Sequence, residues 1–169
     1  RLSNRVGQMA EGDWAQCLAE ADFIEGPRVE ALEKQLSVEL GVPHVVCCGN
    51  GTDALILGLK ARGIGPGDVV ALPALTFWAT YEAVVAVGAT PLLIDVDADD
   101  LQLPLSQLYA AFDAHGFTAC IFVHLFGWTS WRLEALRWWC HEHAVSLLED
   151  GAQSFGVEVG GRPVLEGAA

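Results

Sequence analysis

An acidic residue at the end of an apolar run is the first feature of this sequence that could do chemistry. Residues 145–148 (V-S-L-L) suit a buried strand, and Glu149 and Asp150 follow directly. Parallel sheets bind ligands at the carboxyl ends of their strands, and an unpaired buried charge is unfavourable. Asp150 therefore either meets a cationic ligand or is used locally, where it caps the next turn or pairs with an arginine.

A second candidate is the segment 49–54, G-N-G-T-D-A, which lies between a predicted strand and a predicted helix. The first N–H groups of a helix have no intrahelical acceptor and the helix dipole adds positive charge, so Gly51 and Thr52 could hold a phosphate without a lysine. The segment also satisfies G-x-G-x-x-A, a dinucleotide pattern that requires an acid after the next strand. Leu72 and Pro73 stand there instead. The nicotinamide interpretation is therefore weaker, and a helix start without any ligand stays open.

Two aromatic residues, Phe77 and Trp78, come shortly after the apolar run 69–73. In a parallel sheet they lie at the same carboxyl edge, where a ring can stack on a flat cofactor, although a single aromatic residue there more often belongs to the core. Together, a phosphate cradle, an aromatic ring and a carboxylate match the needs of pyridoxal phosphate. This cofactor requires a phosphate anchor and an acid that keeps its pyridine nitrogen protonated.

The elements that must position these residues alternate along the chain. We predict buried strands over 44–48, 69–73, 91–95, 119–123 and 145–148, and helices over 27–40, 52–62, 105–114 and 131–143, with a further helix ending near residue 87. Strands that are apolar on both faces and alternate with helices indicate an α/β fold with a mostly parallel sheet flanked by helices. Residues 1–26 are weakly patterned. We expect an N-terminal arm over 1–26 and a single domain over 27–169.

The composition limits the classes of function. The net charge is −13 with nine Lys and Arg residues, which argues against sequence-independent binding to nucleic acid or to an anionic membrane, because both need clustered basic residues. No apolar run reaches the length of a membrane span. The five cysteines are irregularly spaced, so they predict core thiols in a reducing compartment rather than a disulfide framework. The N-terminal residues lack the apolar region of a signal peptide, so we expect a cytoplasmic protein.

Two segments resemble metal sites only superficially. The acidic run at 95–100 lacks the central glycine and distal glutamate of an EF-hand loop. The H-E-H sequence at 141–143 is too closely spaced for the zinc motif with two histidines four residues apart. We interpret them as a solvated loop and the exposed end of a helix, and we expect no metal site.

Five motifs, taken in order, resemble one protein family. They are G-N-G-T-D-A-L, G-I-G-P-G-D-V-V-A-L-P-A-L-T-F-W-A-T, G-A-T-P-L-L-I-D-V-D, V-H-L-F-G and E-D-G-A-Q-S-F-G. Their sequence is similar to the DegT/DnrJ/EryC1/StrS aminotransferases, sugar aminotransferases of fold type I that use pyridoxal 5'-phosphate. The resemblance runs from about Ile24 to Gly161. It implies that residues 27–169 are a truncated large cofactor domain of such an enzyme.

The resemblance also implies roles for individual residues. His124, at the start of V-H-L-F-G, either lines the site or is satisfied within the rim of the sheet. The family's cofactor contacts fall on six positions: phosphate contacts on Gly51 and Thr52, ring stacking on Phe77 with Trp78 as second choice, a contact with the pyridine nitrogen on Asp150, and one with the ring oxygen on Gln153.

One family feature has no counterpart in the sequence. The Schiff-base lysine lies well beyond the E-D-x-A-Q motif, whereas the chain ends at Ala169 and its two lysines, Lys34 and Lys60, precede the motif. We therefore expect an N-terminal fragment that is inactive alone and contains no catalytic residue. The parent enzyme would transfer an amino group from glutamate to a keto group of a nucleotide-linked sugar. A sugar dehydratase of the same family and a non-catalytic remnant are alternatives.

The family pairs its subunits, so the resemblance implies a homodimer. Aromatic residues of the second half of the chain are compatible with a buried interface. They are equally compatible with surface left bare in a fragment. The residues are Trp128, Trp131, Trp138 and Trp139.

Overall fold

The structure, a computed structural model, describes residues 14–19 and 26–168. Most of the expected N-terminal arm lies outside the described residues. The chain divides into two compact units, one made of Arg1–Glu39 and Pro43–Cys47 and the other of Leu40–Val42 and Cys48–Ala169. Helix α2 (Pro27–Leu40) accounts for most of the described part of the first unit. The expected boundary at residue 26 stays a prediction.

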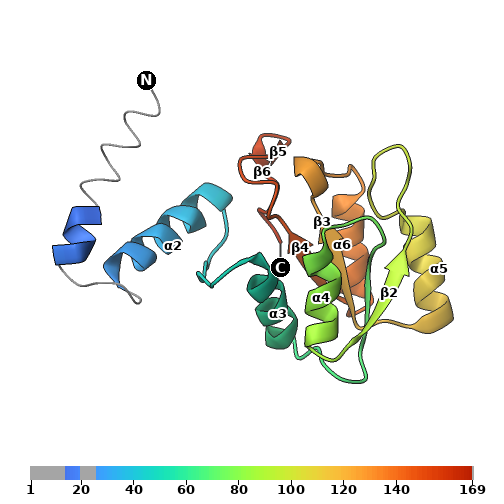
Figure 1. Ribbon diagram of the computed structural model, residues 1–169. Coiled ribbons are helices and arrows are strands. Elements are labelled where there is room, and N and C mark those ends of the chain that lie inside the picture. Colours follow the sequence, from blue (N-terminus) through green and yellow to red (C-terminus); the bar gives the residue numbers. More distant parts are fainter. Residues whose placement is uncertain (1–13, 20–25, 169) are drawn as a thin grey trace. The chain divides into compact units, whose positions relative to one another are not determined.

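A four-stranded parallel sheet forms the centre of the second unit (Figure 1). Strand β1 pairs with both β2 and β3, and β3 pairs with β4, which gives the order β2-β1-β3-β4. The sequence prediction of an α/β fold with a parallel sheet is confirmed. The strands are β1 (Val69–Pro73), β2 (Thr90–Ile94), β3 (Ala119–Val123) and β4 (Ser146–Asp150).

Helices cover both faces of this sheet, and each face has its own core. Because side chains alternate along a strand, Ile121 packs with helices α3 and α4 while the next residue, Phe122, packs with α5 and α6. Strands buried on both faces read as continuous apolar runs, which is why β1 and β3 are recognisable in the sequence. The helices are α3 (Gly51–Ala61), α4 (Trp78–Ala86), α5 (Leu105–His115) and α6 (Leu133–Glu142).

The strand predicted over 44–48 is wrong. Residues 44–48 form no strand, Val46 is 82% exposed, and the N–H of Cys47 donates to Glu33 Oε1 at 2.8 Å. Apolar β-branched residues favour a strand, but a strand also needs a partner to satisfy its backbone groups. In the described residues this segment has none, so a side chain of α2 satisfies one N–H instead.

Strand β4 extends further than predicted. It includes Glu149 and Asp150, which pair with Phe122 and Val123 of β3 rather than following the strand. Consecutive residues of a strand point to opposite faces of the sheet. Glu149 therefore points toward the α6 side and Asp150 toward the α3 side, and the two adjacent acids have different surroundings.

The rest of the second unit is short elements and loops. A 3-10 turn, η1 (Leu125–Gly127), follows β3, and β5 (Glu158–Val159) pairs antiparallel with β6 (Arg162–Pro163). The five cysteines are free thiols, as predicted, but only Cys120 and Cys140 are buried in the core, so the expectation of core thiols is wrong for the other three. Trp139 is only 6% exposed and belongs to the core, so neither interpretation of it, as interface or as bare surface, holds. Within residues 14–19 and 26–168, no helix has the length and apolar character needed to cross a bilayer.

Candidate functional site

Five of the six predicted cofactor residues line one cavity. Its volume is about 320 Å³, and it lies at the carboxyl ends of β3 and β4, beside the first turns of α3 and α4. Volumes of roughly 300–1,000 Å³ are typical of small-ligand sites. The residues brought together are Gly51, Thr52, Phe77, Asp150 and Gln153.

Trp78, the sixth predicted residue, lies outside this cavity wall. Its ring packs against Tyr81, with 5.2 Å between the ring centroids. Phe77 precedes α4 with an extended backbone, and its side chain is 67% exposed. The geometry therefore favours Phe77 over Trp78 as the residue that presents an aromatic ring to the cavity.

The cavity contains free backbone donors at the start of α3. Asn50 is the N-cap, and its Oδ1 accepts the N–H of Asp53 at 2.9 Å while its Nδ2 donates to Asp53 Oδ2 at 2.9 Å. Within the described part of the chain, the N–H groups of Gly51 and Thr52 have no acceptor. Such groups at a helix N-terminus attract anions. The N-x-x-D spacing, a variant of the capping box, could have identified Asn50 from the sequence.

Gly51 leaves space in the cavity. A Cβ atom built on Gly51 would meet no protein atom within 4 Å. The surrounding protein therefore does not demand a glycine here. A ligand that approaches the backbone closely would demand one, because a side chain would occupy the same space.

Asp150 presents a carboxylate that no cation of the described residues neutralises. Its Oδ1 accepts the N–H of Ala152 at 3.1 Å, so the predicted local cap exists. The alternative pairing with an arginine does not, since none of the described basic side chains forms an ion pair with Asp150. One N–H donor leaves most of the acceptor capacity of a carboxylate unused.

Gln153 is oriented by the turn after β3. The N–H of Phe126 donates to Gln153 Oε1, and because an N–H group only donates, the amide oxygen must face it. The NH₂ group of Gln153 is then the free end of the side chain. Phe126 has φ = 59°, in the left-handed region that residues other than glycine rarely adopt. A Cβ at Gly127 would lie 3.0 Å from the carbonyl oxygen of Gln153, so the turn fits closely against this residue.

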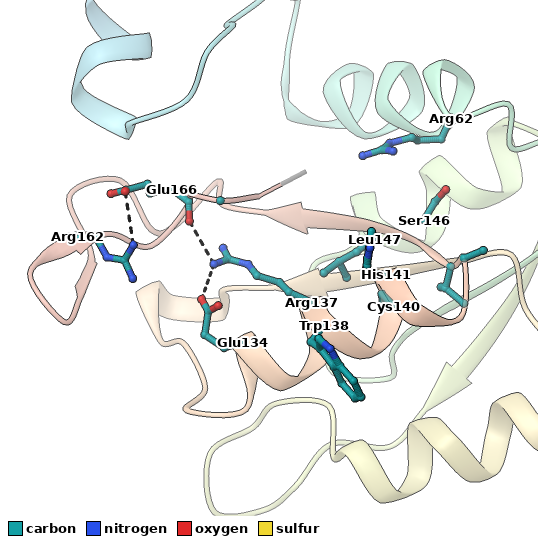
Figure 2. Close-up of a pocket in the computed structure, with 13 residues that line it drawn as sticks. Arg62, Glu134, Arg137, Trp138, Cys140, His141, Ser146, Leu147, Arg162 and Glu166 are labelled. Atoms are coloured by element: carbon teal, nitrogen blue, oxygen red, sulfur yellow. Dashed lines mark hydrogen bonds and ion pairs between the residues drawn. The ribbon is translucent and has the colours of Figure 1, made fainter.

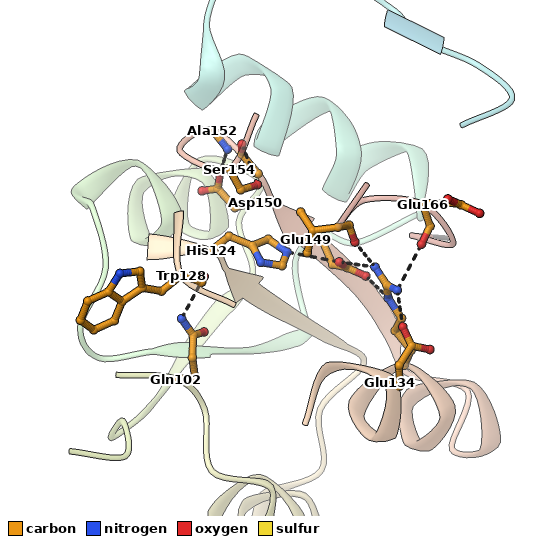
Figure 3. A network of polar contacts seen from close by, with 12 residues as sticks. Gln102, His124, Trp128, Glu134, Glu149, Asp150, Ala152, Ser154 and Glu166 are labelled. Atoms are coloured by element: carbon orange, nitrogen blue, oxygen red, sulfur yellow. Dashed lines mark hydrogen bonds and ion pairs between the residues drawn. The ribbon is translucent and has the colours of Figure 1, made fainter. Parts of the chain in front are cut away.

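Glu149 has the opposite environment to Asp150. Its side chain is 2% exposed and is bound by Arg137 and His124 on the α6 side of the sheet (Figure 3). Burial acts to raise the pKa of the carboxyl, but the hydrogen bonds from His124 and Arg137 outweigh it and hold the pKa below its ordinary value. Glu149 is a satisfied internal anion, and Asp150 is the acid open to a ligand.

A larger cavity of about 740 Å³ lies near the amino end of β4, between α6 and the C-terminal segment (Figure 2). Most of its charged side chains are paired within the protein, Arg62 being the exception among the described residues. Arg137 donates to Glu134 Oε1 at 2.7 Å and to the carbonyl of Glu166 at 3.2 Å, and Arg162 lies 3.7 Å from Glu166. Paired groups offer little to a ligand, so this cavity is not the candidate site.

No group of His, Cys, Asp or Glu side chains among the described residues could hold a metal ion. The acidic run at 95–100 is less solvated than predicted, because Arg132 bridges Asp97 at 2.7 Å and Asp100 at 2.9 Å. This ion-paired loop is structural. Residues 141–143 are exposed at the end of α6, in agreement with the sequence interpretation.

Comparison with known proteins gives consistent results. The profile of the DegT/DnrJ/EryC1/StrS aminotransferase family matches residues 6–169. A UDP-N-acetyl-3-dehydro-alpha-D-glucosamine 3-aminotransferase of Acidithiobacillus ferrooxidans is 40% identical over 147 residues, which are 87% of this chain and 39% of the relative. A dTDP-3-amino-3,4,6-trideoxy-alpha-D-glucose transaminase of Streptomyces venezuelae is 33% identical over 155 residues, or 92% and 40% of the two chains.

Solved structures of the same family share the fold. DesV of Streptomyces venezuelae superposes with a TM-score of 0.84 at 30% identity, over 97% of this chain and 44% of that one. A Brucella abortus aminotransferase of the family gives 0.80 at 38% identity, over 89% and 42%. The chain thus spans about two-fifths of the length of these relatives. On the matched residues and the shared fold, the chain belongs to the DegT/DnrJ/EryC1/StrS aminotransferase family.

Proposed function

We propose that this chain forms the cofactor-binding part of a pyridoxal 5'-phosphate-dependent aminotransferase. The parent enzyme would use glutamate as amino donor and a keto group of a nucleotide-linked sugar as acceptor. Relatives named as UDP-sugar and dTDP-sugar aminotransferases support this substrate class. The observation that carries the proposal is the pairing, in one cavity, of free N–H donors with a carboxylate that lacks a cation.

The polar groups of the cavity fit the three ends of this cofactor. Its phosphate would accept the N–H groups of Gly51 and Thr52 and the Thr52 hydroxyl, in the positive end of the α3 dipole. Its ring oxygen would accept from the NH₂ group of Gln153, whose oxygen is already engaged by Phe126. Phe77 would cover one face of the ring.

Asp150 would select the protonated pyridine nitrogen. A carboxylate with a single N–H donor is stabilised by a charged hydrogen bond, and such bonds are roughly twice as strong as neutral ones. Glu149 cannot compete for the ligand, because Arg137 and His124 already occupy it. When bound, the protonated ring supplies the electron sink that amino-group transfer requires.

We assign no catalytic lysine to these residues. Lys60 lies at the opposite end of α3 from Gly51, which at 1.5 Å per residue is about 14 Å along the helix axis. This portion would therefore bind cofactor without catalysing transfer.

The test is to add pyridoxal 5'-phosphate to the full-length protein and to monitor binding by the visible absorbance band of the bound cofactor. We expect a band with pyridoxal phosphate and none with a nicotinamide dinucleotide. The reverse result would refute the cofactor assignment. Loss of water from the sugar without uptake of an amino group would refute the transferase assignment and leave the cofactor site intact.

We further propose that the parent protein is a cytoplasmic homodimer. Several large aromatic side chains on the second unit are more than half exposed, which suits an interface better than a free surface. Sedimentation of the full-length protein as a monomer at micromolar concentration would contradict the dimer. Cell fractionation tests the location. The side chains are Phe77, Phe126, Trp128, Trp131, Trp138 and Phe155.

A further inference from the structure

Three side chains from α6, β4 and the end of β3 form a buried chain of hydrogen bonds behind the cavity wall (Figure 3). Arg137 Nε lies 2.7 Å from Glu149 Oε1, and Arg137 Nη2 lies 2.8 Å from Glu149 Oε2. His124 Nε2 lies 3.3 Å from the same Oε2. The side chains of His124 and Glu149 are 0% and 2% exposed, so water cannot replace these partners.

The chemistry of Glu149 fixes the state of His124. Both oxygens of Glu149 accept hydrogen bonds from Arg137, whose guanidinium is always charged, so Glu149 is held as a carboxylate, and its lowered pKa agrees with this. An ionised carboxylate only accepts hydrogen bonds. The Nε2 atom of His124 must therefore carry the proton that faces it. Arg137 compensates the charge of Glu149 through two parallel hydrogen bonds, and His124 supplies one further N–H donor to the same carboxylate.

The second ring nitrogen of His124 agrees with this tautomer. Its Nδ1 atom is buried and has no hydrogen-bond partner in the described part of the chain. With the proton on Nε2, Nδ1 is an acceptor. The other neutral tautomer would bury an N–H without a partner among the described residues and would aim a ring lone pair at the carboxylate of Glu149. The ring of Phe122 packs edge-on against the imidazole, with 5.1 Å between the two ring centroids, and this contact limits rotation of the imidazole.

The backbone of His124 belongs to the candidate site. Its N–H donates to the carbonyl of Asp150 at 3.0 Å, and the residue lines the same cavity as Asp150 and Gln153. Two residues later, the N–H of Phe126 holds the side chain of Gln153. A change in the backbone conformation of His124 would thus move the turn that orients Gln153 and the strand end that carries Asp150.

We propose, on the basis of the function proposed above, that His124 is a positioning residue of the cofactor site. Glu149 and Arg137 hold its imidazole in one rotamer and one tautomer. The fixed ring keeps the ends of β3 and β4 together, so that Asp150 and Gln153 keep the spacing that a flat cofactor needs. His124 acts through these two residues and not on the reacting atoms.

The test compares two replacements of His124 in the full-length protein. The probe is pyridoxamine 5'-phosphate, which has no aldehyde to react with a lysine, so its affinity reports the non-covalent site alone. His124→Gln keeps an N–H donor for Glu149, whereas His124→Phe keeps a ring without one. We expect His124→Phe to weaken binding about tenfold or more, as loss of an outer-shell partner does at metal sites, and to shift the absorbance of the bound probe. We expect His124→Gln to stay within about threefold of wild type, since it keeps that donor.

A matched pair of arginines separates positioning from stability. Arg137 and Arg132 are both largely buried, with side chains 15% and 14% exposed, and both bind two acidic residues, but only Arg137 shares a carboxylate, that of Glu149, with His124. Lysine at either position should lower the thermal unfolding temperature. We expect only Arg137→Lys to weaken binding of the probe. The same variant should allow both tautomers of His124, which nitrogen-15 NMR distinguishes.

The outcomes are distinguishable. Equal binding by wild type, His124→Phe and Arg137→Lys would overturn the positioning role and leave the proposed function standing. Failure of the wild-type protein to bind the probe would overturn both.

Discussion

Two cavities of the second unit differ in how far their polar groups are paired within the protein. The larger one, about 740 Å³, is bordered by Arg137 and Arg162, whose charges are met by Glu134, Glu149 and Glu166, and by Arg62, which forms no ion pair with the described acidic residues. The smaller one, about 320 Å³, contains Asp150 and the first N–H groups of α3, which find no cation and no acceptor among the described residues. Volume would favour the first as a binding site. The polar groups that lack partners favour the second, because a group already paired inside the protein gains little from binding a ligand.

The largest effect should come from Asp150→Asn. Loss of a charged hydrogen bond of roughly 3 kcal/mol corresponds to about a hundredfold in affinity. Pyridoxamine phosphate binding, measured by equilibrium dialysis on the full-length protein, should weaken by that factor.

Asp68→Asn is the matched control for this change. Asp68 also accepts a local N–H, from Gly65 at 2.9 Å, but it lies before β1, at the opposite edge of the sheet. It should leave affinity unchanged. Equal losses in the two variants would show that the distinction between paired and unpaired acids is mistaken.

A smaller effect is expected at Gly51, where binding and stability should separate. Gly51→Ala meets no protein atom and should leave stability unchanged or raise it by up to about 1 kcal/mol, since alanine is the better helix former. It should weaken the binding of inorganic phosphate, measured by calorimetry, because the added methyl group occupies the space that the ligand needs. A variant that loses stability and phosphate affinity together would contradict the open cradle.

The aromatic pair gives a still smaller contrast. Phe77→Ala should weaken cofactor binding by about 0.5–1.5 kcal/mol, the range measured for stacked aromatic pairs. Trp78→Ala should change affinity less than twofold, because its ring packs on Tyr81 outside the cavity wall. Titration of both variants with pyridoxamine phosphate tests this order, and the reverse order would make Trp78 the stacking residue.

The paired acid predicts a pH effect on stability. The lowered pKa of Glu149 means that its stabilisation is complete above its ordinary pKa of 4.5 and is lost as the pH falls through the folded-state value. Denaturation of the wild-type protein should therefore become easier in acid. Glu149→Gln should be less stable at neutral pH and should show a shallower dependence below pH 4.5. Parallel curves for the two proteins would mean that Glu149 contributes nothing to acid sensitivity.

Local patterns predicted much of this fold. The strand 69–73 and the helix 27–40 lie where the sequence places them, because their apolar periodicity is a property of adjacent residues. The segment 44–48 has an equally apolar pattern and forms no strand. Strand formation depends on a partner that is distant in sequence, and local propensity carries no information about it.

The site shows the same division. The order of motifs predicted that Asp150 and Gly51 would share a cavity, and they do. The network behind that cavity could not be predicted, since Arg137 and Glu149 are twelve residues apart and His124 comes from another strand end. Their meeting depends on how α6 packs on the sheet. The roles of the cavity residues toward a cofactor stay predictions.

The most direct test of the central claim is the protonation state of the ring nitrogen of bound pyridoxal phosphate, read by nitrogen-15 NMR with labelled cofactor in the full-length protein. A protonated nitrogen in wild type that loses its proton in Asp150→Asn is the predicted result. An unprotonated nitrogen in the wild-type complex, or one that is indifferent to Asp150→Asn, would contradict the assignment of the unpaired carboxylate.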